Sequence, residues 1–222
     1  MRHPLFGLFG LSRAGKRSTP AWPAWPHSAQ AQTRWSSVDG TELTLRAVRS
    51  DDAALLGELF DVQLSRAARY SRFHGAVGRL SAARLAWMAD ADFKHHVAFV
   101  VTCWKDGLEH AVAEGRWVRT GVNPGAEFAL SVADAWQGHG IGQRLLAALL
   151  QTGRDAGLSC LLGDMLASNQ AMQALARSQG LECGPHPDDA ELVRTELSFT
   201  ARAKPTRRAN AFTAFTTAAW QH

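Results

Sequence analysis

Hydrophobic and polar residues alternate along the chain with the periods of strands and helices. The segment from Glu42 to Val48 places Leu43 and Leu45 between polar neighbours, which is the period-two pattern of a half-buried strand. Apolar residues then recur at helical spacing in three segments, and Ser50 and Ser81 are suited to cap the first and the third. These segments are residues 50–60, 65–73 and 81–88.

Two continuous apolar runs of strand length follow, Val97–Thr102 and Ala111–Val118. The turn Lys105-Asp106-Gly107 lies between them, and an Asp-Gly pair favours a tight hairpin connection. The two runs are therefore predicted to pair as antiparallel strands.

The second half of the chain alternates strands and helices with short connections. Strands are expected at Glu127–Val132, Cys160–Leu166 and Leu192–Phe199. Helices are expected over Gly140–Ala156, which Gly157 should end, and from Asn169 to Gly180. A strand–helix–strand unit of this kind places its two strands parallel. The pattern predicts an α/β fold in which antiparallel strands precede a parallel pair.

Basic residues concentrate at the two ends of the chain. The protein has a formal net charge of +4 and a pI near 9.3. Residues 41–200 nevertheless hold 19 Asp and Glu against 15 Lys and Arg, so the positive excess belongs to residues 1–40 and 201–222. Because the expected domain is acidic, we expect it not to bind nucleic acid.

The flanking segments also differ from the middle in composition. Residues 1–40 combine five Lys or Arg with a Pro- and Trp-rich stretch, and we expect a disordered basic tail there. A targeting segment and an overlong choice of start site are alternatives that the sequence leaves open. Residues 201–222 are expected to form a second basic tail, which leaves one domain at residues 41–200.

The cysteines, Cys103, Cys160 and Cys183, are odd in number and show no C-x-x-C spacing. We therefore expect neither a disulfide framework nor a zinc site, and a reducing cytoplasm fits this usage. No apolar run approaches the ~20 residues that cross a bilayer, so no membrane partner is expected.

A glycine-rich turn from Gln137 to Gly142 joins an expected strand to the amphipathic helix after it. Its glycines let the backbone take positive φ and approach a ligand closely. The first amides of the helix lack internal acceptors, and the helix dipole favours an anion there, so the turn predicts a phosphate or pyrophosphate site. A Rossmann-like dinucleotide site is a weaker alternative, because Gln143 stands where the third glycine of its fingerprint belongs.

The same hexapeptide, Gln137–Gly142, resembles the Q/R-x-x-G-x-G/A motif of GNAT acetyltransferases, in which this turn holds the pyrophosphate of coenzyme A. In detail, Phe128–Leu146 and Asn169–Gly180 are similar to the GNAT domain of the bacterial protein lysine acetyltransferase (Pat) type. The resemblance covers residues 41–200 and implies the GNAT acyl-CoA N-acyltransferase fold, a mixed twisted sheet with helices on both faces. It also implies acetyl-CoA as cosubstrate, without a metal.

The resemblance further implies which residues hold the cosubstrate. In this family the strand before the motif splays from its parallel neighbour and offers backbone groups to the pantetheine arm and the thioester. Asn169 matches an asparagine that contacts the cofactor arm, although asparagine is also a favoured helix cap. The implied cosubstrate-binding residues are Leu130, Ser131, Val132, Gln137, Gly138, His139, Gly140, Ile141, Gly142, Gln143 and Asn169.

Acyl transfer to an amine requires that the ammonium lose a proton near the site. Glu127 lies ten residues before Gln137 on the same expected strand, close to where many GNAT enzymes carry a glutamate base, and Glu114 is the reserve candidate. The tyrosine with which many members protonate the thiolate is replaced by Ala176, so Tyr70 or water would supply that proton.

The sequence thus predicts an acetyl-CoA-dependent N-acetyltransferase that acetylates a primary amine by direct attack in a ternary complex. A protein lysine and a small amine stay open as acceptors, and a homodimer stays open as the assembly. A non-catalytic acyl-CoA-binding sensor is the alternative function. The arginines of the expected acceptor region are interpreted as solvating helix faces: Arg66, Arg69, Arg72 and Arg79.

Overall fold

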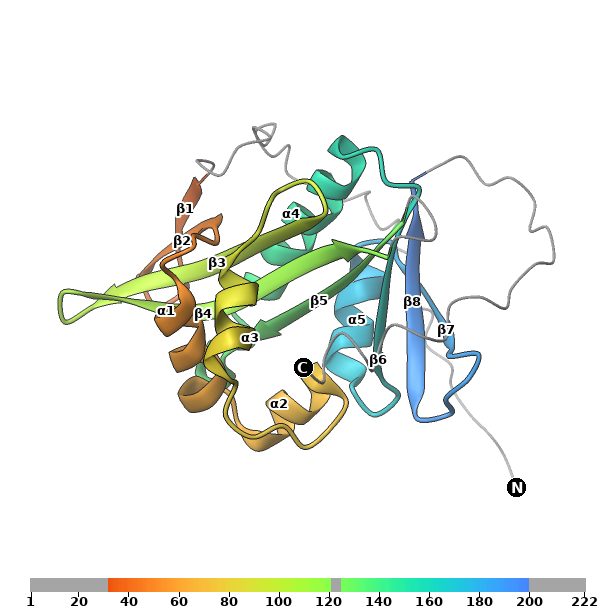
Figure 1. The fold of residues 1–222 in the computed structure, drawn as a ribbon, viewed down its shortest axis with the longest axis horizontal. Coiled ribbons are helices and arrows are strands. Elements are labelled where there is room, and N and C mark those ends of the chain that lie inside the picture. Colours follow the sequence, from red (N-terminus) through yellow and green to blue (C-terminus); the bar gives the residue numbers. More distant parts are fainter. Residues whose placement is uncertain (1–31, 121–124, 200–222) are drawn as a thin grey trace, which may run out of the picture.

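The computed structural model describes residues 32–120 and 125–199, which form an eight-stranded sheet with helices on both faces (Figure 1). The strand order is β1-β2-β3-β4-β5-β6-β8-β7. The strands are β1 (Gln32–Ser36), β2 (Glu42–Ala47), β3 (His96–Lys105), β4 (Leu108–Arg119), β5 (Ala126–Val132), β6 (Cys160–Leu166), β7 (Glu182–Pro185) and β8 (Leu192–Ser198). Neighbouring strands are antiparallel except β5 and β6, which run parallel as predicted.

Five α-helices lie within the described residues, and none of them is long and apolar enough to cross a membrane. They are α1 (Ala53–Glu58), α2 (Arg66–Phe73), α3 (Ala82–Ala89), α4 (Ile141–Asp155) and α5 (Gln170–Ser178). A π-helical turn, Leu59–Gln63, continues α1, and a 3₁₀ turn, Asp134–Trp136, precedes α4.

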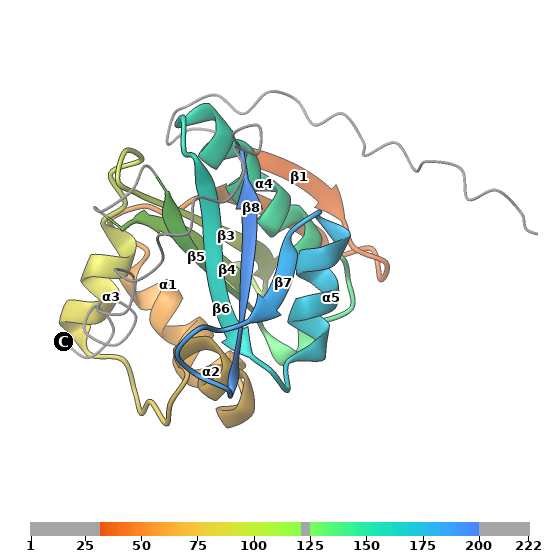
Figure 2. The ribbon, with the colours of Figure 1, turned by 90° about the vertical axis from the view of Figure 1, so that its right-hand side faces the viewer.

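Two apolar clusters attach these helices to the two faces of the sheet (Figure 2). Leu145 and Leu149 of α4 pack against one face, in a cluster that also contains Trp117 of β4. On the opposite face, Leu56 of α1 packs with Met88 of α3. All five side chains are fully buried, and burial of each such side chain contributes about 1.5–3 kcal/mol. The expected arrangement of helices on both faces is confirmed.

The predicted strands and helices are present with end points that differ by a few residues. The β3–β4 hairpin turns through Asp106 and Gly107, which have φ values of 53° and 77°. Positive φ at both central residues is what a tight hairpin turn with the sheet's twist requires. Gly157 follows α4 with a φ of 67°, as its predicted role in ending that helix demands.

Two strands are absent from the predicted set. Residues 32–36 form β1 and pair with β2, so the folded part begins before residue 41 and the expected tail boundary is wrong. β7 is short, carries no alternating apolar pattern, and pairs with β8 at the edge of the sheet. The formation of β1 and β7 depends on pairing with β2 and β8 more than on a strand pattern in their own sequences.

The start of α1 also differs from the prediction. Asp52, rather than Ser50, is the residue before the helix. Its carboxylate accepts hydrogen bonds from the buried Arg46 guanidinium at 2.6 and 2.8 Å and from the Arg49 amide at 2.7 Å. The acid therefore fixes the corner between β2 and α1 instead of capping helical amides.

A β-bulge bends β4 near the end of β5. Val101 pairs with Ala113 whereas Thr102 pairs with Ala111, which leaves Val112 as an extra residue on β4. The Val112 carbonyl accepts a hydrogen bond from the Ala133 amide at 2.8 Å. Bulges of this kind re-aim a strand and often lie next to functional sites.

Candidate active site

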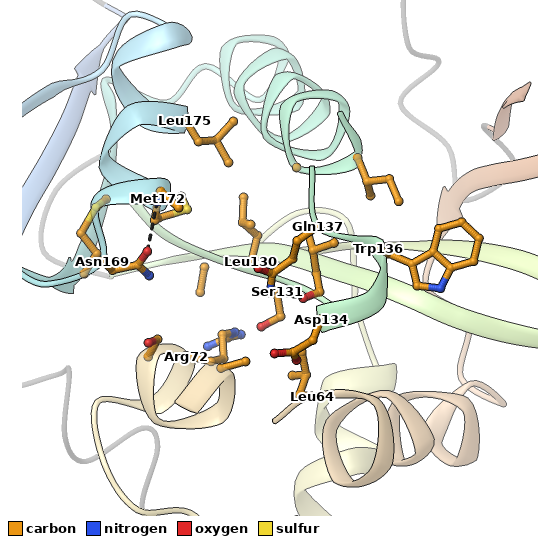
Figure 3. Close-up of a pocket in the computed structure, with 18 of the residues that line it drawn as sticks. Leu64, Arg72, Leu130, Ser131, Asp134, Trp136, Gln137, Asn169, Met172 and Leu175 are labelled. Atoms are coloured by element: carbon orange, nitrogen blue, oxygen red, sulfur yellow. Dashed lines mark hydrogen bonds between the residues drawn. The ribbon is translucent and has the colours of Figure 1, made fainter. Parts of the chain in front are cut away.

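The strands β5 and β6 separate after a short paired stretch. Their described register has two residue pairs, the second of which joins Glu127 to Leu162, whereas β4 follows the other edge of β5 as far as Val132. Backbone groups of β5 beyond Glu127 that point toward β6 therefore face a gap. A cavity of about 600 Å³ lies there, and residues 128–132 form part of its wall (Figure 3).

Strand β6 and several helical segments close the remaining sides of this cavity, which we call the central cavity. One wall is α2 and the residues around it, a second is the turn before α4, and a third is the first turns of α5. Asp134 joins two of these walls, because its carboxylate accepts hydrogen bonds from the Ser65 amide at 2.8 Å and the Ser65 hydroxyl at 2.7 Å. The volume is in the range of small-molecule sites, roughly 300–1,000 Å³.

The glycine-rich turn has the backbone geometry that the sequence predicts. Gly138 and Gly140 line the cavity with φ values of 79° and 74°, and a Cβ atom at either position would meet nothing within 4 Å. The Arg144 amide donates back to the Gly140 carbonyl at 3.3 Å, so the amides before it lack an intrahelical acceptor. Gln137 braces the turn by donating from Nε2 to the Val132 carbonyl at 3.3 Å. This open cradle of amides fits a pyrophosphate.

Not all residues of the predicted motif face the cavity in the same way. Ile141 is 1% exposed and belongs to the apolar core, so its side chain anchors the helix start. A Cβ atom on Gly142 would lie 3.1 Å from Leu175 Cδ2, which shows that this glycine allows α4 to approach α5. Gln143 lines the cavity, whereas the His139 ring lies 5.8 Å from the Trp136 ring and is not among the lining residues.

Asn169 combines the two roles that the sequence leaves open. Its Oδ1 accepts a hydrogen bond from the Met172 amide at 3.0 Å, which caps α5 (Figure 3). The residue also lines the central cavity, and the cap does not use its Nδ2 group. An amide donor thus stands on the α5 wall.

Ser131 adds a buried polar atom to the β5 wall. The residue is 7% exposed, and its hydroxyl oxygen has no hydrogen-bond partner among the described residues. The hydroxyl group of Ser131 and the unpaired edge of β5 both offer hydrogen-bonding groups to the cavity. This part of the wall is therefore suited to a polar ligand.

Glu127 immediately precedes the part of β5 that lines the cavity and is partly buried. Burial raises the pKa of its carboxyl group to about 7, and the neighbouring Asp164 carboxylate acts in the same direction. The charges of Arg72 and Arg194 oppose this rise in pKa. A carboxyl group that titrates near neutral pH can accept a proton from an amine and release it again.

The reserve residues of the prediction do not reach the cavity. Glu114 is fully buried, with Oε1 2.5 Å from Arg116 Nε. Tyr70 is 43% exposed on α2 and is not among the lining residues. Ala176 is fully buried in the apolar core, so the position of the family's tyrosine points into the protein here.

Sequence reasoning missed several polar residues of the site: Ser65, Ser71, Arg72, His74, Asp134 and Asp164. The interpretation of Arg72 as a solvating residue is wrong, because its side chain is 3% exposed and lies 3.7 Å from Glu114. Arg72 follows Ala68 by four residues, so the two side chains lie on the same face of α2, the one that borders the cavity. This spacing could have indicated that Arg72 points inward. The Asp164 carboxylate receives bidentate hydrogen bonds from Arg194 at 2.8 and 2.9 Å. No sequence signal joins β6 to β8 in this way.

Comparison with known proteins gives the family of the chain. The family model described as an acetyltransferase (GNAT) domain matches residues 42–182. The chain belongs to the GNAT acetyltransferase family. GNAT acetyltransferases use acetyl-CoA, and membership confirms both the predicted fold and the predicted N-acetyltransferase class.

Curated relatives carry acetyltransferase names. This GNAT protein is 29% identical to Acetyltransferase PA5475 of Pseudomonas aeruginosa over 161 residues, which are 72% of this chain and 86% of that protein. It is 32% identical to Acetyltransferase Pat of Mycolicibacterium smegmatis over 115 residues, which are 51% of this chain but 34% of that protein. The predicted similarity to Pat is confirmed.

Solved structures share the fold. The GNAT domain of S. lividans PAT superposes with a TM-score of 0.65 at 24% identity, covering 75% of this GNAT chain and 96% of that one. The acetyltransferase yncA from Salmonella typhimurium, solved with its cofactor acetyl-CoA, has a TM-score of 0.58 at 19% identity, with 75% and 99% covered.

Proposed function

We propose that this GNAT protein transfers the acetyl group of acetyl-CoA to a primary amine, either a protein lysine or a small amine, by direct attack in a ternary complex. The observation that carries the proposal is the position of Glu127. It stands at the last pair before β5 and β6 diverge, next to the central cavity, with a pKa near 7. A carboxyl group with this pKa beside the cavity supports the proposal that Glu127 takes the proton of the acceptor amine.

Each wall of the cavity would hold a different part of the cosubstrate. Amides of the turn Gln137–Gly142, followed by Gln143, would bind the pyrophosphate, which has the charge that a helix N-terminus attracts. Backbone groups of Leu130, Ser131 and Val132 would bind the pantetheine arm and the thioester along the free edge of β5. Asn169 would donate from Nδ2 to the same arm, while Oδ1 keeps its cap. His139 would contribute through its amide, because its ring is not among the lining residues.

The chemistry assigned to the chain is a proton transfer at Glu127. The carboxylate accepts the proton of the acceptor ammonium, and the neutral nitrogen bonds to the acetyl carbonyl carbon. The carbon–sulfur bond then breaks with its electron pair on sulfur, and the nitrogen gives its second proton to water, which leaves a neutral amide. Water supplies the proton to the thiolate, since Tyr70 does not line the cavity and position 176 faces the core. Glu127 then releases its proton to solvent.

Substitution Glu127→Gln tests this function. The amide keeps the size of the side chain but cannot accept a proton, so turnover should fall roughly 10²- to 10⁴-fold while affinity for acetyl-CoA changes little. Wild-type turnover should rise with pH through about 7 as the carboxyl group ionises, and the deficit of the variant should shrink at high pH, where more amine is neutral. Thiol release from acetyl-CoA with polyamines, amino acids and lysine peptides is the measurement.

Glu196→Gln is the matched control. Glu196 is an exposed glutamate on β8 that pairs with Leu162 of β6, the same residue that Glu127 pairs with from β5. It should behave as wild type. Retention of more than about a third of wild-type turnover by Glu127→Gln at neutral pH would contradict the assignment, because a positioned base contributes far more than threefold. Acetyl-CoA binding without turnover in the wild type would favour the sensor instead.

A further inference from the structure

A group of buried charged residues lies behind the α2 wall of the central cavity. We call it the buried arginine cluster, and its members are Arg72, Arg84, His96, Glu114 and Arg116. Glu114 holds two of the arginines: Oε1 is 2.5 Å from Arg116 Nε, and Oε2 is 3.7 Å from Arg72 Nη2. The Arg72 side chain is 3% exposed and the Glu114 side chain is fully buried. Arg72 is the member of the cluster that also lines the cavity.

The sheet register places this cluster on the same face of the sheet as Glu127. Glu114 pairs with Ser131, Arg116 with Ala129, and Val118 with Glu127. Paired residues of antiparallel strands point to the same face, and alternate residues along β5 share that face. The Glu127 side chain therefore points to the same face of the sheet as the side chains of Glu114 and Arg116.

The cluster carries more positive than negative charge. These five residues include three arginines and one carboxylate, that of Glu114, which forms ion pairs with Arg72 and Arg116. His96 adds no charge near neutral pH, because burial and the neighbouring Arg116 charge lower its pKa to about 4, and its Nε2 lies 2.8 Å from Arg116 Nη1. Excess buried charge is costly unless another group compensates it.

Arg72 and Glu127 also interact through their charges. The charges that reach Arg72 come from Glu114 and Arg116 on β4, from Arg84 on α3 and from Glu127 on β5. Burial lowers the pKa of Arg72 to about 10, which leaves it cationic at neutral pH, and Glu114 is the main group that opposes this fall. Arg72 thus interacts with two carboxylates: it forms an ion pair with Glu114, and its charge also acts on Glu127, the residue proposed to react.

We propose that Arg72, held by Glu114, is a positioning residue whose positive charge offsets part of the effect of burial on Glu127 and so favours the carboxylate form that takes the acceptor proton. This inference rests on the proposed function of Glu127 as the base. In this proposal neither Arg72 nor Glu114 exchanges a proton with the substrate. Their effect is electrostatic and acts through Glu127.

The directions of the expected effects follow from the charges around Glu127, which are Asp164 on β6, Arg72 on α2 and Arg194 on β8. Arg72→Gln removes a cation that lowers the Glu127 pKa, so this pKa should rise by about one unit or more. Glu114→Gln removes the anion that offsets the Arg72 charge, so the Glu127 pKa should fall. In the Arg72→Gln background the Glu114→Gln substitution should change the Glu127 pKa little, because Glu114 acts on Glu127 through the Arg72 charge, which this background lacks.

The test is a ¹³C NMR titration of the Glu127 carboxyl group in the full chain without acceptor, with its signal assigned by its loss in Glu127→Gln. Arg72→Lys, which keeps the charge, should titrate close to wild type. Arg66→Gln, an exposed arginine on the same helix, is the matched control and should leave the titration unchanged. In turnover, Arg72→Gln should move the acidic limb of kcat/KM to higher pH, with about tenfold loss below the limb.

A folded Arg72→Gln variant whose Glu127 titrates as in wild type would overturn the inference. Where melting curves show that Arg72→Gln is not folded, Glu114→Gln decides: an unchanged or higher Glu127 pKa would refute it. Failure of the proposed function is recognised separately, since Glu127→Gln would then keep its turnover whatever the titrations show.

Discussion

At the scale of single residues, two glycines of one motif have different physical roles. Gly140 has a φ of 74° and borders open space, whereas Gly142 is helical and lies against Leu175. A side chain on Gly142 would disturb the packing of α4 on α5, so the loss of binding in such a variant would have two causes. Gly140 is the position that tests the pyrophosphate cradle alone.

We expect Gly140→Val to remove most acetyl-CoA affinity while the core stays folded. The side chain would project into the ligand space, and the positive φ would cost about 1–2 kcal/mol. Gly107→Val is the control, because Gly107 has a φ of 77° and open surroundings in the β3–β4 hairpin. It should lose similar stability but bind acetyl-CoA as wild type in calorimetric titration. Equal affinities for the two variants would show that the pyrophosphate lies elsewhere.

The raised pKa of Glu127 also predicts a cost in stability. Its folded value of about 7 exceeds the value of about 4.3 in an unfolded chain. The stability associated with this group is therefore complete below about pH 4.3 and is lost as pH rises through 7. Glu127→Gln should accordingly be more stable than wild type by about 1–3 kcal/mol at pH 8, with a smaller difference at pH 5.

Urea unfolding at the two pH values measures this difference. Glu42→Gln provides the control, as Glu42 is an exposed glutamate on β2 and its substitution should change little at either pH. A Glu127→Gln variant that is no more stable than wild type at pH 8 would show that the ionised Glu127 carboxylate does not destabilise the folded protein.

At the scale of elements, the start of α5 joins a structural role to a binding role. Asn169→Ser keeps an oxygen that can cap the helix but removes the amide donor, whereas Asn169→Ala removes both. If the amide binds the cosubstrate, both variants should lose acetyl-CoA affinity by a similar factor, and only the alanine variant should lose about 1 kcal/mol of stability. Ser81→Ala, which removes the cap of α3, should lose stability without affinity. Wild-type affinity in Asn169→Ser would assign the residue to capping alone.

Local signals explain which elements the sequence predicts. The unit β5, turn and α4 is predictable because apolar periodicity, glycines and helix polarity are all encoded within it. Strand β1 and the role of Arg72 are not, because each is fixed by a partner far along the chain: β2 for the strand, and Glu114 for the arginine. Glu127 could be placed near the site by its spacing from Gln137, but its perturbed pKa depends on burial and on Asp164.

At the scale of the whole molecule, cosubstrate binding should stabilise the fold. The cavity is formed by β5, α2, α4 and α5 together, so a ligand in it contacts most layers of the domain. Acetyl-CoA at a hundred times its dissociation constant should add about 2.7 kcal/mol, which raises Tm by roughly 5–10 °C for a protein of this size. Thermal unfolding with and without acetyl-CoA measures this, and Gly140→Val should show little shift. A wild-type Tm unmoved by millimolar acetyl-CoA would contradict the assignment of the cavity.

The order of the strands also has a consequence for how the protein is made. β8 is the last described strand in the sequence, yet it lies between β6 and β7 and supplies Arg194 to Asp164. Until the ribosome has released residues 192–198, β6 has an unpaired edge and the wall beside Glu127 lacks one of its charges. Nascent chains that pause before this point expose a strand edge of the kind that pairs with other chains, so prompt synthesis of β8 protects the folding enzyme from aggregation.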